Sequence, residues 1–96
     1  MNIRRTIIVH GLVQGVSFRK QSQQAARQLG VNGWVRNRSD GTVEACLEGS
    51  ETAVAALIAW CHAGPKNGIV TDVRVTDSGD PEGHDDFVIR EDHRAA

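Results

Sequence analysis

The segment "GWVRNRSDGTVEACLEG", residues 33–49, decides the fold because it contains two strand patterns joined by a short turn. Apolar and polar residues alternate over Gly33–Arg38 and again over Thr42–Glu48, and a period of two is typical of half-buried strands. The residues between them, Ser39 to Gly41, are of types that favour turns. We therefore predict a β-hairpin, whose two strands must pair antiparallel.

A helix is predicted before the hairpin. Residues 18–30, "FRKQSQQAARQLG", are mostly good helix formers. Ser17 is available as the N-cap, and Gly30 suits the left-handed position that follows a helix. The sparse apolar positions predict a helix that lies on a sheet with its other face in water; they are Phe18, Ala25, Ala26 and Leu29.

A second helix is predicted after the hairpin, over "ETAVAALIAWCHAG", residues 51–64. Ser50 can cap its start, and Gly64 with Pro65 ends it. Its apolar positions recur at helical spacing and are Val54, Leu57, Ile58 and Cys61.

Three further strands are predicted at Ile3–Leu12, Ile69–Asp77 and Phe87–Glu91. Crossover connections are almost always right-handed, and the hairpin keeps its two strands adjacent. The compact solution is an α+β fold, the ferredoxin-like βαββαβ two-layer sandwich, with two helices on one face of a mixed sheet and a short extra C-terminal strand. In it the strands at 3–12 and 33–38 run parallel and end at the same rim of the sheet, where ligands bind in related α/β sheets.

Composition limits the classes of protein to consider. The 96 residues, 40% of them hydrophobic, fit one domain over residues 1–96, with residues 92–96 expected to fray. A formal net charge of −1 gives no overall basic field, so no nucleic-acid partner is expected. The N-terminal apolar run is too short for a signal sequence or a membrane span, so we expect a cytoplasmic protein without membrane association.

The cysteines and histidines show no metal-binding or disulfide pattern. Cys46 and Cys61 lie 15 positions apart without a CxxC motif, and we expect both to be free and buried. The histidines form no HExxH motif and no paired spacing with cysteine. The sequence therefore predicts no metal site and no cofactor.

The segment "HGLVQGVSFRK", residues 10–20, indicates an anion site. Gly11 and Gly15 lie between a strand and a helix, where successive backbone N–H groups can point inward at an anion. Arg19 lies in the first helical turn, which is unfavourable for a cation unless an anion compensates it. A guanidinium can bind two phosphate oxygens at once, so we assign this contact to Arg19 and treat Lys20 as a solvated neighbour.

Sharper nucleotide and nucleophile motifs are missing from this segment. The loop does not match the Walker pattern or GxGxxG, and "GVSFR" lacks the last glycine of a nucleophile elbow. Ser17 is thus interpreted as a helix cap, and no cysteine lies close enough to attack phosphorus. By spacing alone, an ordinary turn with a surface arginine remains open.

Two segments, "VHGLVQGVSFR" and "GWVRNRSDGTVE", resemble the two signatures of the acylphosphatases, and "GPKNGIVTDV" and "FVIR" fall where that family has its later elements. The resemblance implies hydrolysis of the carboxyl-phosphate bond of acyl phosphates without a metal. It implies a catalytic pair, Arg19 and Asn37, and a phosphate cradle that consists of Gln14, Gly15, Val16, Ser17, Phe18 and Arg19. Ser17 departs from the glycine or aromatic residue often found there, which leaves substrate preference open.

The resemblance also implies that Asn37 orients the attacking water and that a phosphoryl oxygen of the substrate takes its proton. The side-chain carbonyl of asparagine can accept a hydrogen bond from water but is no general base. An asparagine near a strand end also commonly caps a turn, so a structural role stays open. Asp40 and His10 are interpreted as a turn former and a strand residue.

Two other functions share the predicted topology. One is a non-catalytic module that binds an anion or carbamoyl phosphate, or a regulatory module. An RNA-recognition domain is disfavoured because it needs exposed aromatic residues on the central strands, and residues 42–48 have none. The expected partners are a small acyl phosphate and inorganic phosphate, and the expected state is a monomer.

Overall fold

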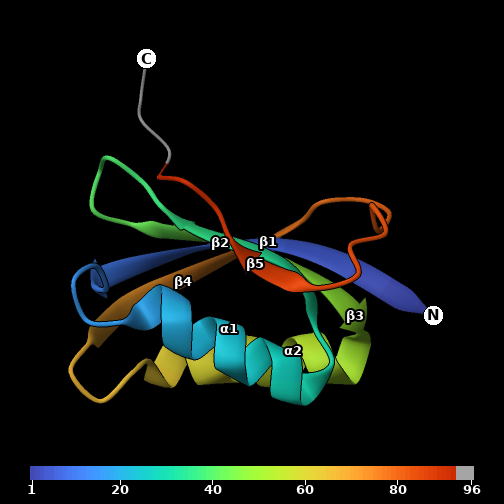
Figure 1. Ribbon diagram of the computed structural model, residues 1–96, viewed down its shortest axis with the longest axis horizontal. Coiled ribbons are helices and arrows are strands. Elements are labelled where there is room, and N and C mark those ends of the chain that lie inside the picture. Colours follow the sequence, from blue (N-terminus) through green and yellow to red (C-terminus); the bar gives the residue numbers. More distant parts are fainter. Residues whose placement is uncertain (93–96) are drawn as a thin grey trace.

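The computed structural model describes residues 1–92 and contains the predicted elements in the predicted order (Figure 1). They are β1 (Asn2–Leu12), α1 (Phe18–Leu29), β2 (Asn32–Asn37), β3 (Val43–Ser50), α2 (Glu51–Ala63), β4 (Ile69–Asp77) and β5 (Phe87–Ile89). The prediction of a frayed tail falls, apart from Asp92, outside the described residues. No helix within residues 1–92 is long and apolar enough to cross a membrane.

The strands form one sheet in the order β4-β1-β3-β2-β5. β3 pairs antiparallel with both β1 and β2, so these two strands run parallel to each other and end at the same rim. β5 adds a parallel edge next to β2. Both helices cover one face of the sheet (Figure 1), which confirms the ferredoxin-like two-layer prediction.

The core fills the space between the sheet and the helices. Its buried members include Ile7, Val9, Ala45, Leu47, Val54, Leu57 and Cys61. Ser50 caps α2 as predicted, because its Oγ accepts a hydrogen bond from the Ala53 amide at 3.1 Å. Both cysteines are free and buried, as predicted.

The predicted apolar stripe of α1 is wrong at Leu29, which is 38% exposed. The helix instead buries Phe18, Ser22 and Ala26, which are spaced four residues apart and so share one face. The polar Ser22 is tolerated in the core because its hydroxyl donates to the Arg19 carbonyl at 2.8 Å.

Two glycines permit backbone approaches that no side chain allows. At Gly11, the register of β1 against β4 skips a residue, and an added Cβ would lie 2.0 Å from the Ile69 carbonyl oxygen. The extra residue of this β-bulge is Thr71 on β4, opposite the point where the chain leaves β1. Gly33 has φ +135°, and its Cβ would lie 1.9 Å from the Cys46 carbonyl oxygen on β3.

The substitution Gly33→Ala is expected to lower the free energy of unfolding by about 3 kcal/mol, because the new methyl group clashes with backbone that side-chain rotation cannot move. Gly79→Ala is the control, since Gly79 also has positive φ but an added Cβ meets nothing within 4 Å. It should cost about 1 kcal/mol. Urea denaturation measures both, and equal losses would contradict the steric argument.

Candidate functional site

A pocket of about 430 Å³ lies at the rim where β1 and β2 end and α1 begins. Its lining residues are Val13, Gly15, Ser17, Phe18, Arg19, Lys20, Asn37 and Ile89. The structure thus brings most of the predicted site residues to one cavity. Gln14 and Val16 do not line it, and Lys20, expected to be a solvated neighbour, is exposed but does.

The loop before α1 leaves a row of backbone amides without protein acceptors. Within residues 1–92, the six amides from Gly15 to Lys20 donate to no carbonyl or side chain; the first amide bond of the helix region runs from Gln21 to the Ser17 carbonyl, at 3.0 Å. Gly15 has φ 75° and Ser17 has φ 61°, and Ser17 is the one non-glycine residue with positive φ in the described chain. Alternating turns of this kind direct successive N–H groups at an anion.

The prediction that Ser17 caps α1 is wrong. Its side chain makes no capping hydrogen bond. N-cap residues that accept from the helix have extended backbone, whereas Ser17 is left-handed. Ser17 therefore contributes its left-handed backbone and its backbone amide to the pocket. Hydrophobic periodicity and capping rules do not predict a left-handed backbone at a serine.

The two helices differ in electrostatics at their first turns. α2 has a serine cap and Glu51 in its first turn, so its positive end is compensated within the protein. α1 has neither a cap nor an acidic residue there, and Arg19 adds a further positive charge. The N-terminus of α1 is consequently a place where an anion is stabilised by free amides, by the helix dipole and by a guanidinium.

The Arg19 side chain has one ionic partner in the described chain. Its Nη1 lies 3.1 Å from Asp92 Oδ1, and the two side chains are 36% and 54% exposed. Exposed pairs of this kind contribute about 0–1 kcal/mol. Because the contact is weak and uses one nitrogen, the remaining donors of the guanidinium fork stay available to a ligand in the pocket.

Asn37, the last residue of β2, lines the same pocket as Arg19 and has an unpaired acceptor. Its Oδ1 is buried, and no donor within residues 1–92 reaches it. A buried acceptor without a partner costs about 1–3 kcal/mol. The role of turn cap, left open for Asn37, is filled by Asp40, whose Oδ1 accepts from the Thr42 amide at 3.1 Å. The Thr42 hydroxyl and amide hydrogen bonds hold the pKa of Asp40 below its ordinary value.

Gln14 connects the loop to the hairpin that carries Asn37. Its Nε2 donates to the carbonyl oxygens of Arg38 at 2.7 Å and of Thr42 at 2.8 Å. The side chain predicted for the phosphate cradle is thus directed at the hairpin backbone. Sequence reasoning missed this contact because its acceptors are backbone groups 24 and 28 positions away, which leave no residue-type signal.

Comparison with known proteins gives consistent matches. The acylphosphatase family model matches residues 5–89. An acylphosphatase of Haloquadratum walsbyi is 52% identical over 91% of this chain and 92% of its own. The crystal structure of acylphosphatase from Bacillus subtilis superposes with a TM-score of 0.89 at 42% identity, covering 94% of this chain and 99% of that one. Full-length HypF in its phosphate- and nucleotide-bound form matches 98% of this chain at 26% identity and TM-score 0.90, but over 12% of its own length.

The substitution Gln14→Ala is expected to lower the free energy of unfolding by about 1–2 kcal/mol, because two carbonyls lose a donor. It should also weaken the binding of inorganic phosphate several-fold, since the loop is no longer fixed to the hairpin. Gln24→Ala is the control, because Gln24 is an exposed glutamine on α1, the helix that follows the loop. Urea denaturation and calorimetric titration provide the two measurements, and unchanged phosphate affinity in Gln14→Ala would contradict the linking role.

Proposed function

Because this chain belongs to the acylphosphatase family, we propose that it hydrolyses acyl phosphates to a carboxylate and inorganic phosphate. One observation carries the proposal: loop residues with free amides and Arg19 line the same pocket as Asn37, whose side-chain carbonyl is buried and has no hydrogen-bond partner within residues 1–92. The amides and the guanidinium are suited to bind a phosphoryl group. The Asn37 side chain is suited to bind a water molecule next to that group.

In this proposal the amides of Gly15 to Arg19 and the guanidinium of Arg19 bind the oxygens of the phosphoryl group. They hold the charge that these oxygens carry as the bond to the carboxylate lengthens. The carboxylate is a good leaving group, so little covalent assistance is needed. Positioning of the reactants can then supply about 7–11 kcal/mol of the barrier reduction.

Asn37 directs the attacking water. Its Oδ1 accepts a hydrogen bond from the water and turns a lone pair toward phosphorus. Among residues 1–92, the pocket lining contains no carboxylate or histidine. In this proposal the proton of the water passes to an oxygen of the phosphoryl group itself. The water oxygen forms the new bond to phosphorus, and the carboxylate leaves with the electrons of the broken one.

The second candidate is a module that binds an anion without turnover. The match to a small part of full-length HypF favours it, because there the same fold is a segment of a much longer chain. The acylphosphatase match in contrast extends over 92% of the relative's own length. We therefore place catalysis first. We also propose that the protein is a monomer in the cytoplasm without membrane partners; the two free buried thiols support this compartment. The net charge of −1 supports the absence of a nucleic-acid partner.

Hydrolysis of benzoyl phosphate in the presence of a chelator separates the two candidates. An acylphosphatase of the proposed mechanism releases benzoate and inorganic phosphate at an unchanged rate when EDTA is added. A module that only binds anions releases no phosphate above the spontaneous rate, and that result would overturn the proposal.

The substitution Arg19→Lys should reduce kcat/KM for benzoyl phosphate about 100-fold or more, because an ammonium cannot make the two parallel contacts of a guanidinium. The inhibition constant for inorganic phosphate should increase, because phosphate loses the same contact. The free energy of unfolding should stay within about 1 kcal/mol of the original, since the replaced ion pair is exposed. Steady-state kinetics with near-normal kcat/KM would refute the assignment.

The substitution Asn37→Ala should reduce kcat about 100-fold while the inhibition constant for phosphate changes little, because it removes the water acceptor and not the phosphate donors. It also removes a buried unpaired oxygen, so the protein should be as stable as before or more stable. Steady-state kinetics and urea denaturation test both points. A large loss of stability would show that Asn37 is a structural residue.

A further inference from the structure

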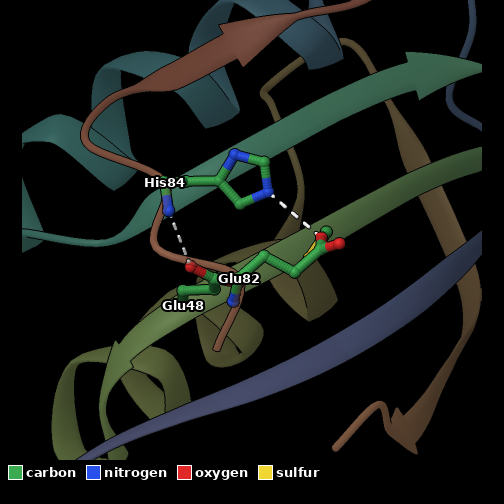
Figure 2. A group of neighbouring side chains, drawn as sticks. Glu48, Glu82 and His84 are labelled. Carbon is green, nitrogen blue, oxygen red and sulfur yellow. Dashed lines mark hydrogen bonds and ion pairs between the residues drawn. The ribbon is translucent and has the colours of Figure 1, made fainter. Parts of the chain in front are cut away.

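A second group of reactive side chains lies on the other face of the sheet, at the end remote from the pocket. Cys46 and Glu48 come from β3, where their spacing of two places them on the same face. Glu82 and His84 come from the connection between β4 and β5. Figure 2 shows the His84 ring directed at the Glu82 carboxylate, with the Glu48 carboxylate beneath the backbone of the same connection.

The donor atoms of these four residues lie within 4.8 Å of one another. In a tetrahedral zinc site, with metal–ligand distances of about 2.0–2.3 Å, neighbouring donor atoms are about 3.3–3.6 Å apart. Side-chain rotations suffice to close this difference. Cys46 and Glu48 are 0% and 3% exposed, so two of the donors are held rigidly, while Glu82 on the exposed connection can adjust.

The buried carboxylate of Glu48 retains coordinating capacity. Its Oε1 accepts from the amides of Gly83 and His84, both at 3.1 Å, and its Oε2 accepts from the Glu82 amide. A carboxylate oxygen has two lone pairs, so Oε2 can accept this amide and still offer a lone pair to a cation.

The charge of the cluster favours an additional cation. The guanidinium of Arg4 contacts it, with Nε 3.4 Å from Cys46 Sγ and 3.8 Å from Glu48 Oε2, and Nη2 3.2 Å from Glu82. One guanidinium faces two carboxylates, which leaves one negative charge in excess. A divalent ion that displaces the Cys46 thiol proton to solvent brings the group to neutrality, and it does so against the burial that raises the pKa of this thiol.

We propose that Cys46, Glu48, Glu82 and His84 form a binding site for a zinc-like divalent ion. One sulfur, one imidazole nitrogen and two carboxylate oxygens are the donor types of zinc sites, whereas calcium and magnesium take oxygen ligands. The ion displaces Nε and Nη2 of Arg4, whose Nη1 remains bound to the Ser78 carbonyl at 2.8 Å. The ion fastens the β4–β5 connection to the sheet, so it stabilises the fold and takes no part in the pocket.

The cluster lies on the face of the sheet opposite the helices, because Cys46 and Glu48 alternate along β3 with the core residues Ala45 and Leu47. The pocket lies at the start of α1. Along the sheet, Cys46 pairs with Trp34, three residues or about 10 Å before Asn37. Hydrolysis of benzoyl phosphate should consequently be unchanged when the site is filled.

Titration of the full, untagged chain with Co²⁺ tests the proposal, because a cobalt–thiolate bond gives a charge-transfer band that ordinary carboxylate binding does not. We expect this band at one equivalent of Co²⁺ and its loss when Zn²⁺ is added. Cys46→Ser should abolish the band. Cys61→Ser is the matched control, since Cys61 is also free and buried but lies in the core away from the cluster, and it should keep the band.

Two further variants keep the test decisive if Cys46→Ser fails to fold. Glu82→Gln changes an exposed side chain and should weaken Co²⁺ binding by about 10-fold or more. Arg4→Gln removes the guanidinium that competes with the ion and should strengthen Co²⁺ binding. Absence of the band in both the original chain and Arg4→Gln, or a band lost in Cys61→Ser and kept in Cys46→Ser, would overturn the proposal and leave the cluster as the ionic partner of Arg4.

Discussion

The pairing of β1 and β2 on opposite sides of β3 is the constraint on which the rest of the structure depends. Because both strands are antiparallel to β3, they end at one rim, and the loop after β1 meets the hairpin after β2. The bulge at Gly11 and the two hydrogen bonds of Gln14 then fix how these segments meet. The loop amides, Arg19 and Asn37 thereby meet at one pocket although they come from different elements.

The pocket is the part of the molecule where the usual rules of polar satisfaction are broken. The start of α2 is capped and compensated by Ser50 and Glu51, and the buried Glu48 receives three amide hydrogen bonds. The start of α1 has free amides and a misplaced cation, and Asn37 has a buried acceptor without a donor. Water satisfies the exposed amides, whereas the buried Asn37 oxygen lowers stability. The gathering of these groups in one pocket supports the proposal that a substrate binds there.

The sequence predicts the architecture well because its signals are local. The alternation over residues 33–49 and the two helical runs determine which elements form, and chirality rules leave one compact arrangement. The errors occur in and near α1, where a hydrogen bond and a backbone conformation that residue types do not report override those signals. Ser22, and not Leu29, lies on the buried face, where its hydroxyl donates to the Arg19 carbonyl. The position of Ser17 predicts a cap, but its left-handed backbone prevents it from capping the helix.

The candidate site was predictable only in part, for the same physical reason. Arg19 and Asn37 lie in segments with recognisable residue patterns, whereas the contacts of Gln14 and the cluster around Glu48 join residues 24 to 38 positions apart. The central claim, that the amides of Gly15 to Arg19 bind the phosphoryl group, is tested most directly by ¹H–¹⁵N NMR titration with inorganic phosphate. The account predicts that the amide resonances of these residues shift together and saturate. Shifts confined to other surfaces, with these five resonances unmoved, would contradict it.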